Sequence, residues 1–257
     1  GYINNIIARF WRAPVFGIQL SKQLIGEERE INFNSNYGKT NHISGPHEFS
    51  FFWHHWFKME EMPPYDRKFA DKVIDWCGFA NKIREMARAW GRPMVMKAPD
   101  VGYHISRVAE VLPEALFVHI NRDLADVACS ILKGRIAYYE NEDTWLGSYP
   151  DEWERVSKLS GREQIAWQVV SLNRMYKDGL NKLDKSRRYE ISLANLCGEA
   201  DFVVESIARK ISDMGYTPPL KLGAVTSGDI RSNTYAEEPE YREFSRLIQE
   251  LVEGPLK

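Results

Sequence analysis

Apolar positions between residues 94 and 133 follow two different periods, and they predict the centre of the fold. Short apolar runs at Met94–Met96 and Leu116–Ile120 have the length of buried strands, and Pro99 ends the first. Residues 104–112 and 123–133 repeat their apolar side chains at helical spacing instead. Strand, helix, strand and helix in this order indicate a βαβ unit. We therefore predict an α/β fold in which a parallel β-sheet is flanked by helices.

Helical periodicity recurs along the rest of the chain. A β-branched and aromatic run at Arg188–Leu193 predicts a further strand, and the polar segments 27–44, 60–66, 134–160 and 218–234 are typical of loops. No internal repeat or long linker divides the sequence, so residues 1–257 are predicted to form one domain. The further helices are predicted over Tyr2–Trp11, Ala13–Ile25, Lys68–Trp90, Arg162–Leu183, Asp201–Met214 and Glu240–Val252.

Charge and cysteine content narrow the classes of function. The formal net charge of the 257 residues is -2, which disfavours a nucleic-acid-binding protein of the usual basic kind. Cys77, Cys129 and Cys197 lie far apart without a Cys-x-x-Cys motif, which argues against a metal site and a disulfide framework and favours a reducing compartment such as the cytoplasm. No apolar run has the length of a membrane span, and no secretory signal is visible, although the sequence begins at Gly1 rather than methionine.

Two cations follow the predicted strands. Lys97 comes after the first strand and Arg122 after the second, and ligands of parallel sheets bind beyond these strand ends. Arg122 and Ser130 together suit a phosphate, because a guanidinium offers forked donors and a hydroxyl adds another hydrogen bond. The alternatives are an Arg122 paired with Asp123 or Asp126, a Ser130 packed within its helix, and a solvated Lys97.

Candidate proton acceptors lie elsewhere in the chain. Glu48 stands in the aromatic segment 47–57, where apolar surroundings would raise its basicity, or it is a surface carboxylate that pairs with a nearby cation. His104 is a second candidate base, or a histidine that caps or packs. His119, inside an apolar strand, is expected in the core, and the adjacent His54 and His55 face different sides, which disfavours metal binding. The sequence contains no Gly-x-Ser-x-Gly, Walker-type or dinucleotide-binding motif.

Taken together, these motifs resemble the core of sulfotransferases that use 3′-phosphoadenosine 5′-phosphosulfate (PAPS). The matching stretches are Lys97-Ala-Pro and the run from Phe117 through Asn121-Arg-Asp-Leu-Ala-Asp to Ser130, with Leu124 in place of the family's proline. The resemblance implies a P-loop NTPase-like sulfotransferase fold. It also implies that Arg122 and Ser130 bind the 3′-phosphate and that Lys97 acts near the transferring group.

The resemblance extends to both sides of this block. His47-Glu-Phe-Ser-Phe-Phe52 resembles the Lys-Glu-x-x-Phe-Phe segment of glycosaminoglycan-type members, which implies that Glu48 is the base, with His104 second. Val101 stands where other members have a catalytic histidine. Arg-Tyr-Glu at 188–190 resembles the strand whose tyrosine lies near the adenine, although Ile-Ser replaces Asp-Leu after it. The resemblance therefore assigns the nucleotide side of the site to Tyr189, Thr226 and Ser227.

The implied activity is transfer of a sulfuryl group from PAPS to a hydroxyl or amine of a small-molecule or carbohydrate acceptor. The product nucleotide is adenosine 3′,5′-bisphosphate (PAP), and no metal is required. The family's phosphosulfate-binding loop is expected before residue 1. A P-loop small-molecule kinase and a catalytically silent nucleotide-binding or interaction protein of the same fold remain alternatives. A Golgi lumen location is the alternative to the cytoplasm.

Overall fold

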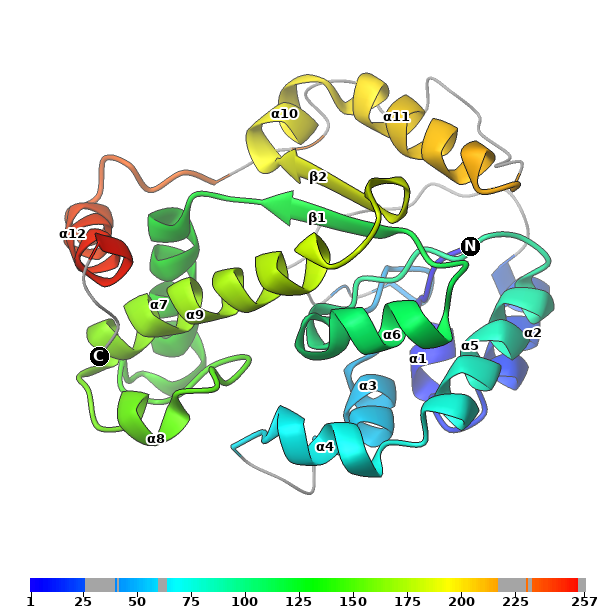
Figure 1. The fold of residues 1–257 in the computed structure, drawn as a ribbon, viewed down its shortest axis with the longest axis horizontal. Coiled ribbons are helices and arrows are strands. Elements are labelled where there is room, and N and C mark those ends of the chain that lie inside the picture. Colours follow the sequence, from blue (N-terminus) through cyan, green and yellow to red (C-terminus); the bar gives the residue numbers. More distant parts are fainter. Residues whose placement is uncertain (26–39, 41, 60–63, 217–229, 231–232, 254–257) are drawn as a thin grey trace. The chain divides into compact units, whose positions relative to one another are not determined.

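The computed structural model describes residues 1–25, 40, 42–59, 64–216, 230 and 233–253 (Figure 1). Over these residues the chain forms two compact units, Gly1–Pro113 and Glu114–Lys257, each with its own buried core. Most of the predicted loops at 27–44 and 218–234 fall outside the described ranges. The prediction of one domain over residues 1–257 stays a prediction.

The first unit consists of short helices around an aromatic core. Phe49, Phe52, Phe57 and Phe79 are almost fully buried, and the rings of Phe49 and Phe52 stack with centroids 4.5 Å apart. Buried aromatic rings contribute large apolar areas, so this cluster supplies much of the stability of the unit. Its helices are α1 (Asn5–Arg9), α2 (Pro14–Ile25), α3 (Ser50–Phe57), α4 (Arg67–Val73), α5 (Trp76–Trp90), the 3-10 helix η1 (Pro99–His104) and α6 (Ile105–Val111).

The predicted helix over Lys68–Trp90 is wrong, because the structure has two helices there, α4 and α5. Ile74 leaves the helical region (φ -67°, ψ 129°) and buries its side chain. The Asp75 side chain then accepts a hydrogen bond of 2.8 Å from the backbone N–H of Gly78 and caps α5. A capping aspartate satisfies N–H groups that a helix start leaves free, so the apolar periodicity continues across a real break.

The predicted strand at Met94–Met96 is also wrong as a strand of the sheet. In the described part of the chain it forms only a one-residue parallel bridge between Val95 and Tyr2, supported by a bond of 2.7 Å from the Val95 N–H to the Gly1 carbonyl. The Val95 side chain is 71% exposed, so the run is not a buried strand. Pro93 has no N–H, and Pro99 follows closely, which leaves little backbone for a ladder.

The described residues of the second unit contain two strands, β1 (Phe117–Asn121) and β2 (Arg188–Ser192), which pair in parallel from Phe117 opposite Arg188 to Asn121 opposite Ser192 (Figure 1). Mostly helical with a small parallel sheet, the protein is α/β, as the sequence predicted. The strand that pairs with β1 is therefore β2, and not the predicted strand Met94–Met96. The remaining elements are α7 (Leu124–Tyr139), α8 (Trp153–Val156), α9 (Gly161–Asn181), the 3-10 helix η2 (Lys185–Arg187), α10 (Leu193–Gly198), α11 (Ala200–Asp213) and α12 (Pro239–Glu253).

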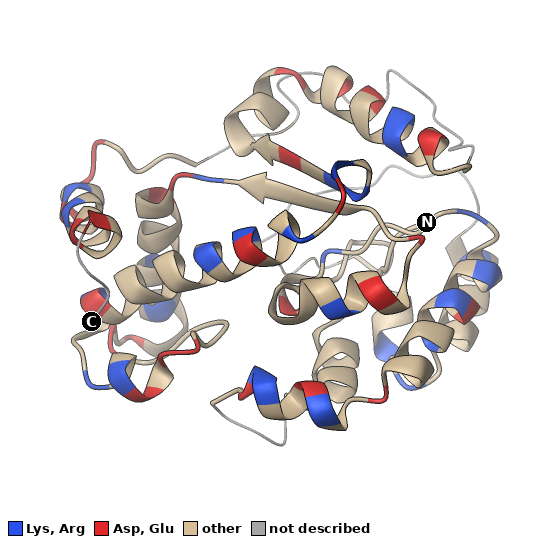
Figure 2. Ribbon diagram, in the orientation of Figure 1, with Lys and Arg blue, Asp and Glu red and all other residues tan. Residues whose placement is uncertain are grey.

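Helices α7, α9 and α12 enclose the core of the second unit, in which Ala128, Cys129, Ile165 and Phe244 are fully buried. The sequence placed the end of α7 at Lys133, but the helix continues to Tyr139. The extension is stabilised by Arg135, whose side chain is buried against the start of α9. Lys and Arg alternate with Asp and Glu along α4, α9 and α12, so none of these helices carries a charge of one sign only (Figure 2).

Candidate functional site

Glu48 lies in a tightly held turn just before α3. The next residue, Phe49, is buried and takes the left-handed conformation (φ 62°), which is uncommon for a bulky residue. The Trp53 indole N–H donates a 2.8 Å hydrogen bond to the Glu48 carbonyl, and the Phe49 N–H donates one of 2.8 Å to His47 Nδ1. These contacts fix the backbone that carries the Glu48 side chain, which remains 33% exposed.

Lys97 Nζ donates a hydrogen bond to Glu48 Oε1 and forms an ion pair with it. The two residues are 49 positions apart in the sequence. The sequence indicates a role for each of them but does not predict that they touch. The Lys97 side chain is 68% exposed, so its ammonium group can leave the carboxylate at little cost in packing. The site thus combines a partly exposed carboxylate with a largely exposed cation.

Asp100 and His54 extend this cluster. His54 Nε2 lies 3.8 Å from Asp100 Oδ2, and the Asp100 side chain is only 13% exposed. Burial raises the pKa of the Asp100 carboxyl, the positive charge of His54 opposes that rise, and the nearby Glu48 carboxylate adds to it. Asp100 is not among the residues predicted from the sequence, although its place three residues after Lys97 is a signal that could have identified it.

His104 is built into the core instead. The Tyr65 hydroxyl lies 2.5 Å from His104 Nε2 and 3.0 Å from the Phe57 carbonyl oxygen. Because a carbonyl can only accept, the single Tyr65 proton goes to Phe57, and the His104 Nε2–H donates to Tyr65. Burial, and then the charge of Arg67, lowers the pKa of His104 to about 4. This arrangement favours the packing interpretation of His104 over its role as a base.

Arg122, in the second unit, lies between β1 and α7. Its Nη2 donates a 2.6 Å hydrogen bond to the Asn233 carbonyl, and its guanidinium carbon is 5.7 Å from the centre of the Tyr235 ring. Its Nε is buried and has no hydrogen-bond partner among the residues that the structure describes. A buried, unpaired guanidinium N–H is costly, which favours an additional acceptor at this position.

The two aspartates considered as partners of Arg122 accept from backbone groups. Asp123 caps α7 by accepting from the Asp126 N–H at 2.9 Å, and Asp126 Oδ1 accepts from the Tyr235 N–H at 2.7 Å. Ser130 is half-buried and follows Asp126 by one helical turn, so the two share a face of α7. Arg122 and Ser130 thus flank the residues at the start of α7.

The other predicted nucleotide contacts have less structural support. Tyr189 lies in β2 opposite Val118 and is half-buried. Thr226 and Ser227 lie outside the described residues. Glu48, Lys97 and His104 belong to the first unit, whereas Arg122, Ser130 and Tyr189 belong to the second. His119, which we expected in the core, is largely but not fully buried. Its Nδ1 lies 3.9 Å from Glu190 Oε2.

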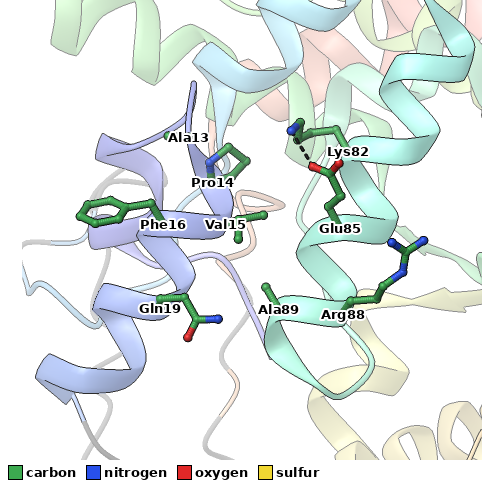
Figure 3. Close-up of a pocket in the computed structure, with 9 residues that line it drawn as sticks. All are labelled: Ala13, Pro14, Val15, Phe16, Gln19, Lys82, Glu85, Arg88 and Ala89. Carbon is green, nitrogen blue, oxygen red and sulfur yellow. Dashed lines mark hydrogen bonds and ion pairs between the residues drawn. The ribbon is translucent and has the colours of Figure 1, made fainter.

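A surface hollow of about 540 Å³ lies between α2 and α5 (Figure 3). Val15 and Phe16 line one side, and the hydrogen-bonded Lys82 and Glu85 lie on the other. Gln19 and Arg88 are the other polar side chains that line it. None of the candidate site residues that the structure describes lines the hollow, so the Glu48 cluster is the better guide to the site.

Among the described residues, no group of three or more His, Cys, Asp or Glu side chains is arranged to hold a metal ion. None of the helices in this part of the chain combines the length and apolarity that a membrane span requires.

Comparisons with protein-family models, with curated proteins and with solved structures found no match to this chain.

Proposed function

We propose that the protein is a PAPS-dependent sulfotransferase of the P-loop fold that acts on a hydroxyl or amine of a small-molecule or carbohydrate acceptor. The observation that carries the proposal is the ion pair between Glu48 and Lys97. It joins a base and a cation, the two groups that in-line sulfuryl transfer needs at the reacting centre. The resemblance of residues 94–130 to the donor-binding core of that family supports the same conclusion.

In this proposal Lys97 and Glu48 separate when the donor binds. Lys97 turns to the sulfuryl oxygens, where it neutralises the charge that develops on the leaving phosphate. Glu48, released from its partner, accepts the proton of the acceptor hydroxyl. A bond forms between the acceptor oxygen and sulfur, while the bond from sulfur to the 5′-phosphate oxygen breaks and PAP leaves. Positioning supplies most of the remaining rate enhancement, as in phosphoryl transfer.

The resemblance implies that Arg122 and Ser130 bind the 3′-phosphate of the donor. The unpaired Arg122 Nε supports this role, since a phosphate oxygen would satisfy it. The Nη2 group is bonded to the Asn233 carbonyl, so a phosphate would share or replace that contact.

The three free cysteines are compatible with a reducing compartment, and we propose the cytoplasm as the location.

An exposed aromatic surface near Glu48 suits a ring-shaped acceptor. Phe51 lies three residues after Glu48 in the sequence and is 58% exposed. Its ring stacks on that of Trp11, with the centroids 6.4 Å apart. The His55 ring lies 5.4 Å from Trp11 and continues the surface. Flat apolar faces of this kind stack on aromatic rings and on the apolar faces of sugars.

The test is transfer of labelled sulfate from PAPS to a panel of phenolic, steroid and sugar acceptors. We expect Glu48→Gln to lower turnover by roughly 100-fold or more, because it removes the base. Binding of PAP, measured by calorimetry, should stay unchanged. Glu110→Gln is the matched control, since Glu110 is an exposed glutamate of the same unit that also pairs with a cation, Arg107.

The outcomes separate the alternatives. Near-normal turnover in Glu48→Gln would remove Glu48 as the base and return attention to His104. A strict requirement for magnesium and ATP, abolished by EDTA, would favour the small-molecule kinase. Binding of PAP without transfer to any acceptor would favour the catalytically silent nucleotide-binding protein, and absence of both would refute the proposal.

A further inference from the structure

The corner between α1 and α2 carries a group of adjoining aromatic rings on its surface. Phe16, in the first turn of α2, is 57% exposed, and its ring meets that of Phe10 edge-on, with the centroids 5.0 Å apart. Trp11 is partly exposed and continues the group toward α3, where its ring stacks on that of Phe51. Aromatic side chains that adjoin one another in contact with water are typical of an interaction site, whereas a single exposed ring is not.

Close packing fixes the backbone of this corner. The Ala13 N–H donates a hydrogen bond of 2.8 Å to the Phe10 carbonyl, and Pro14, at the start of α2, is buried. At Gly17 a Cβ would lie only 3.1 Å from Ile7 Cα and from Phe10 Cβ, so the missing side chain lets α2 approach α1 closely. The exposed rings are therefore presented by a well-packed turn.

The charge of this region is of one sign. Residues 1–25 contain no Asp or Glu, and neither does α3. The cationic side chains of residues 1–25 are Arg9, Arg12 and Lys22. Arg9 and Arg12 are exposed, and neither forms an ion pair with a residue that the structure describes. The Arg12 guanidinium carbon lies 4.6 Å from the centre of the Trp11 ring, so a positive charge and an aromatic face adjoin.

The surface hollow between α2 and α5 borders the corner, because Phe16 lines it (Figure 3). Its Glu85 carboxylate is hydrogen-bonded to Lys82, and Arg88 adds a further cation. The described charged residues that line the hollow therefore leave one positive charge in excess. The border of the corner is thus positive as well.

We propose that this corner, defined by Phe10, Trp11, Arg12 and Phe16, is a docking surface for an anionic lipid membrane. Tryptophan and phenylalanine rings are favoured where lipid headgroups meet the acyl chains. Arginine side chains are attracted to the anionic headgroups at the same level. A bilayer presents apolar and anionic groups together over its whole surface, so a short corner can meet both at once. A protein partner would need an acidic and apolar patch of matching shape.

The inference does not depend on the proposed function, because docking to a membrane involves neither PAPS nor the pair of Glu48 and Lys97. Phe51 and Trp11 also belong to the surface proposed for the acceptor. The binding test therefore changes Phe16 and Arg12 instead. Both side chains are exposed, so their replacement should leave the fold intact, which circular dichroism checks.

The test is sedimentation of the full chain with vesicles of phosphatidylcholine alone and with about 30% phosphatidylglycerol. We expect binding to the anionic vesicles that weakens as salt is added, because salt screens the attraction between arginines and headgroups. Arg12→Gln should lower the partition coefficient by about fivefold, because one charge near the lipid surface is lost. Phe16→Ala should lower it by roughly tenfold, because a ring that leaves water on docking is lost.

Two residues of α11 serve as matched controls. Phe202 is 60% exposed, and Arg209 is exposed as well. The same helix also carries Asp201 and Glu205, so its charges are mixed. Phe202→Ala and Arg209→Gln should therefore bind anionic vesicles as the unmodified protein does.

Quenching by brominated lipids locates the contact. Bromine atoms on the acyl chains quench a tryptophan that enters the bilayer, so anionic vesicles with brominated lipid should lower the fluorescence of the protein. Trp11→Phe keeps an aromatic ring and should still bind, but most of the quenching should be lost. Trp145→Phe, which changes a tryptophan of the second unit, should be quenched as the unmodified protein is.

Each result decides the inference. Binding to anionic vesicles that is weakened by Arg12→Gln and Phe16→Ala, but not by the α11 variants, supports the corner. Absence of binding to anionic vesicles, or equal binding of Arg12→Gln and the unmodified protein, refutes it. An equal loss in the α11 variants, or quenching that survives in Trp11→Phe, would place the contact elsewhere and also refute it. Because the vesicles contain no PAPS, these results stand whether or not the protein transfers sulfate.

Discussion

The buried His104 makes a prediction about stability that can be worked out from the structure. Its side chain is 3% exposed, and burial holds its pKa at about 4, compared with 6.5 for an unperturbed histidine. As the pH falls through about 6.5, the unfolded chain takes up a proton at this position and the folded protein does not. The stability that neutral His104 contributes is therefore present above this pH range and is lost as the pH falls through it.

The size of the effect follows from the two values. Between about pH 7.5 and about pH 5.5 the free energy of unfolding should fall by about 1.4 kcal/mol on account of His104 alone. This window avoids most titration of carboxyl groups. His47 and His119, whose pKa values are also lowered by burial, add changes of the same sign.

Urea unfolding followed by circular dichroism, at both pH values, measures this quantity. His104→Gln isolates the contribution of the histidine, because the amide can still donate to the Tyr65 hydroxyl but has no proton to gain. The pH dependence of the variant should be weaker by about 1.4 kcal/mol across the window, and the exposed His55→Gln should behave as the unmodified protein. An equal pH dependence in His104→Gln and the unmodified protein would refute the neutral, packed state of His104.

Three further predictions concern the charged groups. Lys97→Met should lower turnover, because it removes the cation proposed to meet the sulfuryl oxygens; near-normal turnover would exclude Lys97 from the reaction. Arg122→Ala should weaken PAP binding by roughly 10-fold to 100-fold in calorimetry, and Arg122→Lys by less, because one charge remains without the fork; unchanged affinity would exclude the anchor. Arg135→Met should destabilise the protein by about 2–4 kcal/mol in urea unfolding. The reason is that the fully buried Arg135 guanidinium donates a hydrogen bond to the Glu142 carbonyl and packs on Trp145. The control Arg155→Met, at an exposed arginine that lies over Trp167, should cost under about 1 kcal/mol.

The sequence predicted elements well where a repeating pattern carries the information. The apolar spacing in Arg162–Leu183 and Glu240–Val252 corresponds closely to α9 and α12, and the run at Arg188–Leu193 corresponds to β2. It failed where one side chain decides the outcome. The cap by Asp75 breaks a helix whose periodicity is continuous, and Met94–Met96 has strand composition but too little free backbone to join the sheet.

Residue chemistry and resemblance to a family point to part of the candidate site. The sequence indicates Glu48 and Lys97 separately, and the structure adds that they touch. The sequence does not indicate Asp100, because it lies in a short 3-10 helix with no apolar periodicity and its surroundings depend on a tertiary contact with His54. Contacts between distant segments are set by packing, which a single sequence does not display.

The pairing of Glu48 with Lys97 gives a reason why the proposed enzyme would activate the acceptor only after the donor has bound. A carboxylate held by an ammonium group is a poor base, and here the ammonium is the group that the sulfuryl oxygens would attract. Because the Lys97 side chain is largely exposed, the exchange needs only a rotation of one flexible chain. The energy of donor binding would then both place the sulfuryl group and release the base, so an acceptor bound alone would keep its proton.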